Sequence, residues 1–139
     1  MRFSFSICAL LLLNAAAAIG QEEQQSTTEI AVQWHWDVVS TPDFYGPFRG
    51  TDAGFRNPKP KQPLPMSLRL THDKEPFGVF EALVGVEGVT MPERTISVSS
   101  QETERVVNEI LSKWRFAPAT LDGKPIRVRL RVHLNKKIG

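Results

Sequence analysis

The last quarter of the chain carries the pattern that most constrains the fold. Between residues 126 and 134 every second residue is apolar, and the residues between them are three arginines and a histidine. The apolar set is Ile126, Val128, Leu130, Val132 and Leu134, and the polar set is Arg127, Arg129, Arg131 and His133. Successive side chains of a β-strand point to opposite sides, so this period of two predicts a strand with one apolar and one solvated face. Such a strand needs a sheet whose apolar face is covered by a second layer.

An amphipathic helix that could form this layer is predicted before the strand. Apolar residues recur at helical spacing in residues 106–114, namely Val106, Val107, Ile110, Leu111 and Trp114. Residues 99–102 (Ser-Ser-Gln-Glu) form a capping-box pattern that starts the helix, and Pro118 keeps it from continuing. Asp122-Gly123 then predicts a turn into the strand.

Further strands are predicted upstream of the helix. Residues 66–71 alternate between apolar and polar side chains, and residues 79–86 (VFEALVGV) are mostly apolar, so we expect these two segments to form a hairpin. Pro92 is expected to break the next segment, and a short strand at residues 95–98 leads into the helix.

The order two strands, helix and last strand predicts an α+β domain at residues 66–139. In it, a small antiparallel sheet carries one amphipathic helix packed on one face. Trp114 and Phe116 are expected to seal that face.

The first twenty residues have the pattern of a secretory signal peptide. Arg2 precedes an apolar run at residues 7–19, and small residues lead up to Gly20. The run has about 13 residues where a spanning helix needs about 20. We therefore expect cleavage after Gly20, with a retained membrane anchor as the alternative. Cys8, the only cysteine, lies within this segment, so we expect no disulfide, thiolate nucleophile or cysteine-bearing zinc site.

Residues 21–65 are predicted to precede the domain. A polar lead at 21–28 is followed by an alternating segment that predicts a strand. Its apolar side holds Ile30, Val32, Trp34, Trp36 and Val38. Residues 40–65 carry six prolines, which indicates a linker or an irregular loop that is extended at 58–65.

We find no catalytic constellation in the sequence. It has no Gly-x-Ser-x-Gly elbow, no phosphate-binding glycine-rich loop before a helix and no His-Glu-x-x-His motif. His35, His72 and His133 are far apart in the sequence, and Glu102 and Glu104 lie where a helix start favours acidic residues. We therefore expect no enzymatic activity, no metal and no cofactor.

Nucleic acid is not an expected partner either. The formal net charge is only +2, which is too small to attract nucleic acid or an anionic membrane by its field. No aromatic residue lies between the arginines of the last strand to stack on bases.

Trp34 and Trp36 admit two interpretations. On the apolar side of an alternating strand, aromatic residues usually belong to the core. The alternative is a ligand-stacking face in which Trp34, Trp36 and His35 serve a secreted ligand binder or hydrolase. That function would need a concave pocket around Trp34.

The last strand offers a binding mode of its own, because no later strand follows it in the chain. At a sheet edge, its free backbone N–H and C=O groups could pair with an extended peptide. The main chain would then supply affinity, and the arginine row would select acidic or polar peptides. The alternative is a central strand, paired within its own sheet or with a second copy of the chain.

Residues 110–134 (ILSKWRFAPATLDGKPIRVRLRVHL) resemble the C-terminal domain of the TonB family of energy transducers. The resemblance is carried by Trp114-Arg115-Phe116, Pro118-Ala119, Asp122-Gly123-Lys124-Pro125 and the alternating strand behind them. Residues 21–65 have no counterpart in that family. The resemblance implies a periplasmic domain whose last strand, here Ile126–Leu134, pairs with a short segment of outer-membrane transporters. It also implies structural roles for Trp114, Phe116, Pro118 and Gly123.

We therefore expect a periplasmic protein-binding module whose last strand pairs with a peptide of an outer-membrane transporter or another envelope protein. The alternative is a membrane-anchored energy transducer for TonB-dependent transport, which requires that residues 1–20 are retained. A homodimer is compatible with either function.

Overall fold

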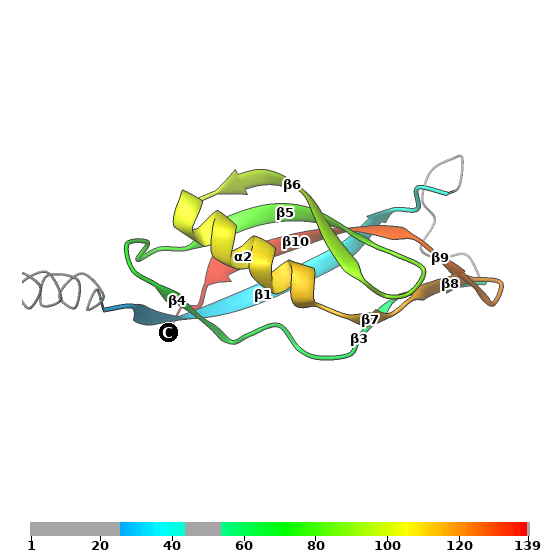
Figure 1. The fold of residues 1–139 in the computed structure, drawn as a ribbon, viewed down its shortest axis with the longest axis horizontal. Helices are drawn as coiled ribbons and strands as arrows, with labels where there is room; N and C mark the ends of the chain where they lie inside the picture. Colours follow the sequence, from blue (N-terminus) through cyan, green and yellow to red (C-terminus); the bar gives the residue numbers. More distant parts are fainter. Residues whose placement is uncertain (1–25, 44–53, 139) are drawn as a thin grey trace, which may run out of the picture.

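The computed structural model describes residues 26–43 and 54–138. The predicted signal peptide, residues 21–25 of the polar lead and residues 44–53 lie outside this description. The described chain is mostly antiparallel β-structure with one helix, α2 (Gln101–Lys113) (Figure 1). The strands are β1 (Thr28–Ser40), β2 (Phe55–Arg56), β3 (Lys59–Pro60), β4 (Ser67–Leu70), β5 (Phe77–Val84), β6 (Thr90–Val98), β7 (Phe116–Ala117), β8 (Ala119–Leu121), β9 (Lys124–Ile126) and β10 (Val128–Lys136).

The main sheet has five antiparallel strands in the order β4-β1-β10-β5-β6. Helix α2 lies across one face of this curved sheet (Figure 1), which we call the inner face; the opposite one is the outer face. The predicted arrangement, one amphipathic helix on one face of an antiparallel sheet, is confirmed. The sheet is larger than expected because β1 belongs to it, so it extends across the predicted boundary at residue 65.

Strand β4 does not form the predicted hairpin with residues 79–86. It pairs with the first half of β1, from Thr28↔Leu70 to Ala31↔Ser67, whereas β5 pairs with β6 and β10. The alternation of residues 66–71 predicted a strand, but it could not identify the partner strand.

Strand β6 runs through Pro92, which we expected to break it. A proline is tolerated here because β6 is the last strand on its side of the sheet, so a missing N–H need not interrupt a ladder. The pairing with β5 also shifts register twice, between Val79 and Phe80 and between Glu81 and Ala82.

Helix α2 begins one residue later than the capping-box pattern predicts. The N-cap is Ser100, whose hydroxyl oxygen accepts a hydrogen bond from the backbone N–H of Thr103 at 3.1 Å. The predicted apolar stripe is confirmed, because Val107, Leu111 and Trp114 are buried and the other two residues pack against the core.

Two carboxylates fasten the loop after β4 to the start of α2. Glu102, instead of closing a capping box, accepts hydrogen bonds from the backbone N–H groups of Thr71, His72 and Asp73 at 2.7–3.0 Å. Asp73 accepts hydrogen bonds from the hydroxyls of Ser99, Thr103 and Ser100. Burial by itself would raise the pKa of both carboxyls, but these hydrogen bonds outweigh it and lower each pKa to about 2.

The predicted turn at Asp122-Gly123 joins β8 to β9. Both residues have positive φ angles, 51° and 82°, as a type I′ turn in a two-residue hairpin loop requires. The strand predicted at residues 126–134 is β10, which begins at Val128, while Ile126 belongs to β9.

Residues 57–65, which we call the proline strap, are not a free linker. Within this strap β3 pairs with β7, and two indole N–H groups hold backbone carbonyls: Trp114 donates to Gln62 at 3.0 Å and Trp34 to Pro65 at 2.7 Å. Of the two predicted alternatives, a linker or an irregular loop, the second describes these residues, because aromatic side chains of β1 and of the end of α2 bind the strap to the core.

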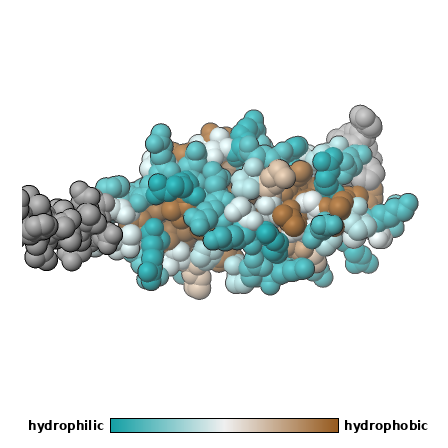
Figure 2. Space-filling view, viewed as in Figure 1, coloured by the Kyte–Doolittle hydropathy of each residue, from teal (hydrophilic) through white to brown (hydrophobic). Residues whose placement is uncertain are grey.

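The core lies between the inner face and α2. Its largest fully buried side chains include Phe80, Phe116, Leu68, Leu70, Leu111, Leu130, Leu134, Val84, Val107, Val128 and Val132. Trp114 is 2% exposed and Phe116 is fully buried, as predicted, while Pro118 is half-buried. On the helix side the surface is a mixture of polar side chains and small apolar patches (Figure 2).

Candidate functional site

The predicted peptide-binding strand is central in the sheet. Strand β10 pairs with β1 from Val32↔Lys136 to Ser40↔Arg129 and with β5 from Asn135↔Phe77 to Val128↔Val84. The expected sheet-edge position of residues 126–134 was therefore wrong, because a strand from the N-terminal part of the chain completes the sheet on that side. We call the position beside β10 that β1 occupies the β10 lane.

Strand β1 lies in the β10 lane as an extended peptide would. Its inner-face side chains start buried at Ile30 and Val32 and become half-buried at Trp34, Trp36 and Val38. On β10 the inner-face side chains of Val128, Leu130, Val132 and Leu134 are buried, whereas Lys136, the partner of Val32 at the end of the strand, is exposed. β1 therefore contributes fewer fully buried side chains than β10 over the length of their pairing.

Three aromatic residues join β1 to the end of the helix. The ring of Trp36 meets Trp114 at a centroid distance of 5.8 Å and Phe116 at 5.7 Å, both nearly edge-on, at 86° and 83°. Edge-to-face contacts of this kind stabilise aromatic pairs beyond the area that they bury. These contacts connect the middle of β1 to the residues that follow α2.

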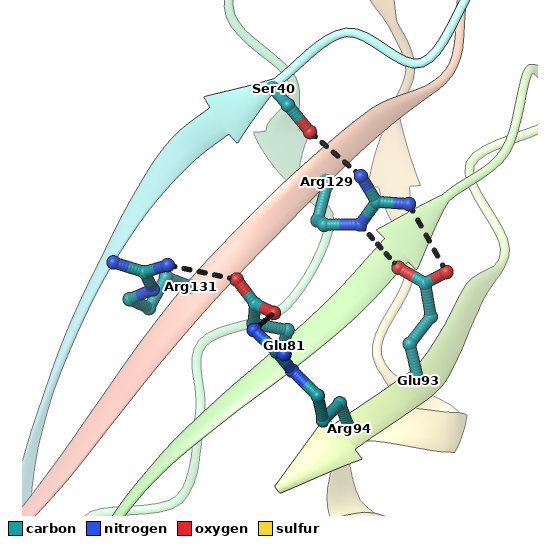
Figure 3. Close-up of polar contacts among 6 residues, drawn as sticks. All are labelled: Ser40, Glu81, Glu93, Arg94, Arg129 and Arg131. Carbon is teal, nitrogen blue, oxygen red and sulfur yellow. Dashed lines mark hydrogen bonds and ion pairs between the residues drawn. The ribbon is translucent and has the colours of Figure 1, made fainter. Parts of the chain in front are cut away.

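The outer face carries a charged network centred on Glu81, which is only 7% exposed (Figure 3). Its carboxylate accepts hydrogen bonds from Arg131 on β10 and Arg94 on β6. Burial by itself would raise the pKa of Glu81, but the hydrogen bonds from Arg131 and Arg94 outweigh it and lower the pKa. The network fixes β10 to the strands on one side of it.

The other arginines of the predicted row also have partners within the chain. Arg129 donates from Nε and Nη2 to the two carboxylate oxygens of Glu93. Its third guanidinium nitrogen, Nη1, donates to the hydroxyl of Ser40 at 3.0 Å (Figure 3). Arg127 pairs with Asp43, just after β1. The row was expected to select acidic or polar peptides, but its guanidinium groups already bind carboxylates of the same chain.

Trp34, Trp36 and His35 do not form one site. The two indoles lie on the inner side of β1, whereas His35 lies on the outer side, where it contacts Asp37. A shallow groove of about 310 Å³ does border Trp34 and Trp36, and the proline strap forms its other wall. The ligand binder or hydrolase that would use all three residues is therefore not supported, and the core interpretation of the two tryptophans is favoured.

The three histidines are distributed over two places. His35 and His133 are direct cross-strand partners on the outer face, and His72 lies in the loop after β4. Within residues 26–43 and 54–138, no group of three or more His, Cys, Asp or Glu side chains is arranged to hold a metal ion.

Sequence reasoning missed the carboxylates that pair with the arginines of the outer face, such as Glu81 and Asp43. Glu81 interrupts an apolar strand at residues 79–86, which is the one signal that could have marked it as a buried, paired charge. Nothing in the sequence relates Asp43 to Arg127, because 84 positions separate them.

Among the described residues, no helix is long and apolar enough to cross a membrane. Comparisons with models of known families, with curated proteins and with solved structures find no match for this chain.

Proposed function

We propose that the protein is a non-enzymatic, periplasmic protein-binding module of the TonB C-terminal type, and that the β10 lane is its peptide-binding site. In the free protein β1 fills this lane, and an extended segment of a partner takes its place on binding. The observation that carries the proposal is the antiparallel pairing of β1 with β10, since it is the pairing that a bound peptide would make.

The order of elements supports the resemblance behind this proposal. Strands β5 and β6, helix α2 and strand β10 come in the order strand, strand, helix and strand, with the short strands β7, β8 and β9 between α2 and β10. Strand β1 comes from outside this unit, so it is the strand that a partner segment would replace.

The two edge strands of the sheet, β4 and β6, are less suited than the β10 lane to pairing with a peptide. Strand β6 carries Pro92 and two register shifts, and β4 is only four residues long. Prolines, bulges and short edge strands hinder the addition of a further strand. A peptide that extends this sheet at either edge would therefore pair less well than one in the β10 lane.

The lane also defines what the peptide must look like. Apolar side chains at alternate positions would have to replace Val32, Trp34 and Trp36 against the core, and a polar side chain would face Arg131 on the outer face. The partner class is thus an alternating, extended segment of an outer-membrane transporter or another envelope protein.

A strand-exchange experiment tests the proposal. A fluorescently labelled peptide with the sequence of residues 27–41 is titrated into the whole protein, and anisotropy measures binding. We expect saturable binding, and none for a control peptide in which Val32 and Trp36 are replaced by proline.

A locked variant provides the second arm. Gln33 and Asn135 are direct partners in the pairing of β1 with β10, so Gln33→Cys with Asn135→Cys, in a Cys8→Ser background, can close a disulfide across the lane. The oxidised variant should not bind the peptide, and the reduced one should. Equal binding by both forms, or no binding by the unmodified protein, would contradict the proposal.

A further inference from the structure

Two histidines, one on β1 and one on β10, lie opposite each other on the outer face. His35 on β1 and His133 on β10 are partners in the antiparallel register, and their ring centroids are 6.0 Å apart with the planes tilted by 44°. The side chain of His35 is 70% exposed, so its ring can turn without disturbing the core. His133 is half-buried and therefore more restricted.

This spacing is close to what a shared metal ion needs. Imidazole nitrogens bind Zn²⁺ at about 2.0–2.1 Å, which places the centres of two rings on one tetrahedral ion about 5 Å apart. A rotation of the exposed His35 ring can close the remaining distance.

Asp37 can orient the ring of His35 for metal binding. Nε2 of His35 lies 2.9 Å from a carboxylate oxygen of Asp37, two residues along the same face of β1. When Nε2 donates to the carboxylate, the lone pair is on Nδ1, which is left to bind a metal. A histidine that binds a metal through one ring nitrogen usually donates the N–H of its other ring nitrogen to a carboxylate, a backbone carbonyl or water.

We propose that His35 and His133 form a two-histidine site for a divalent transition-metal ion, with water completing the coordination and Asp37 as a positioning residue. Imidazole ligands select Zn²⁺, Ni²⁺ and Cu²⁺ over Ca²⁺ and Mg²⁺. Because one ligand is on β1 and the other on β10, the bound ion joins the two strands and stabilises the fold.

Titration calorimetry on the tag-free protein tests the site with Zn²⁺, Ni²⁺ and Cu²⁺ added singly. We expect one ion per chain, with Cu²⁺ bound most tightly. His35→Ala and His133→Ala should each weaken binding at least about tenfold, and Asp37→Asn should weaken it less. His72→Ala is the matched control and should bind the ion as the unmodified protein does, since His72 lies in the loop after β4 and on neither of the two strands.

Thermal unfolding gives the readout for the connection between strands. Zn²⁺ should raise Tm by several degrees over the value in chelator for the unmodified protein and for His72→Ala, but not for His35→Ala with His133→Ala. Binding that persists in the double variant, or binding without a rise in Tm, would overturn the inference.

One consequence rests on the proposed function: saturating Zn²⁺ should slow exchange of the labelled peptide into the lane. Calorimetry keeps the two proposals separate. If the ion binds through both histidines but no peptide enters the lane under any condition, the proposed function fails and the metal site stands. If peptide enters but no metal binds, the metal site fails alone.

Discussion

The two faces of the main sheet have the same backbone but different chemistry. Along β10, Val128, Leu130 and Val132 are fully buried on the inner face, which is the face that α2 lies across (Figure 1). The residues between them, such as Arg129 and Arg131, lie on the outer face and form ion pairs with carboxylates from neighbouring strands. One strand thus contributes to an apolar core and to a charged network at alternate residues.

The inner face contributes more to the stability of the fold than the outer face does. Burial of an apolar side chain stabilises the fold by about 1.5–3 kcal/mol, whereas partly exposed ion pairs contribute about 0–1 kcal/mol. We therefore expect changes to the inner face and to the backbone of β10 to affect folding strongly, and changes to the outer face to affect it less.

The largest effect is expected from a proline in the middle of β10. Arg131→Pro removes a backbone donor from a strand that is paired on both sides, which should destabilise the fold by about 3 kcal/mol or more. Circular dichroism and urea unfolding measure the loss. Arg131→Gln, which keeps the backbone donor, is the control and should remain folded. A normally stable Arg131→Pro variant would show that β10 is not the central strand.

An effect of about the same size is expected on the inner face. Trp114→Ala should destabilise the protein by about 3–5 kcal/mol, because the buried ring packs on Trp36 and Phe116 and its N–H holds the proline strap. Met91, which is 61% exposed, provides the comparison: Met91→Ala should change the free energy of unfolding by less than about 0.5 kcal/mol. Equal losses for both variants would remove the distinction between the core and the surface.

A smaller effect is expected where α2 is fastened to the loop after β4. Asp73→Ala leaves three hydroxyl groups without their shared acceptor and should cost about 2 kcal/mol in urea unfolding at pH 7. Asp37→Ala, which removes an exposed carboxylate, is the control and should cost less than about 0.5 kcal/mol.

The same carboxylate predicts a pH dependence. The folded pKa of Asp73 is about 2, below its ordinary value of 3.8, so its contribution to stability is complete above about pH 4. It should be lost as the pH falls from 4 towards 2. Asp73→Ala should therefore lose less stability than the unmodified protein over this interval, and identical pH profiles would contradict the assigned role.

The smallest effect is expected in the charged network of the outer face. Glu81→Gln keeps the volume of the side chain but leaves Arg94 and Arg131 without a counter-ion, which should cost about 1–2 kcal/mol. The value stays below that of Trp114→Ala because both guanidinium groups remain partly hydrated. Glu93→Gln, in the more open pair with Arg129, should cost about 0.5 kcal/mol. A loss at Glu81 as large as that at Trp114 would contradict the ranking of the two faces.

The site was less predictable than the fold. Trp114 was identified as core because it lies on the apolar stripe of the helix predicted at residues 106–114, and Phe116 was expected to seal the same face of the sheet. The partners of Arg127 and Arg129 were not predictable, because an exposed arginine can pair with any carboxylate that the fold brings near, and Asp43 and Glu93 lie far from them in the sequence.

The local elements could be predicted from the residue pattern. The period of two in residues 126–134, the helical stripe in residues 106–114 and the turn at Asp122-Gly123 each specify a structure through contacts between near neighbours. These elements appear as β10, α2 and the β8–β9 turn.

The pairing of the strands became known only from the folded structure. An alternating strand is equally suited to a sheet edge or to the centre, because its side chains specify which face is buried but not which backbone lies beside it. The place next to β10 was therefore open until β1, from the far end of the described chain, was found to fill it. Pairing between distant segments depends on the packing of all layers together, and this is why the central position of β10 could not be predicted from its own residues.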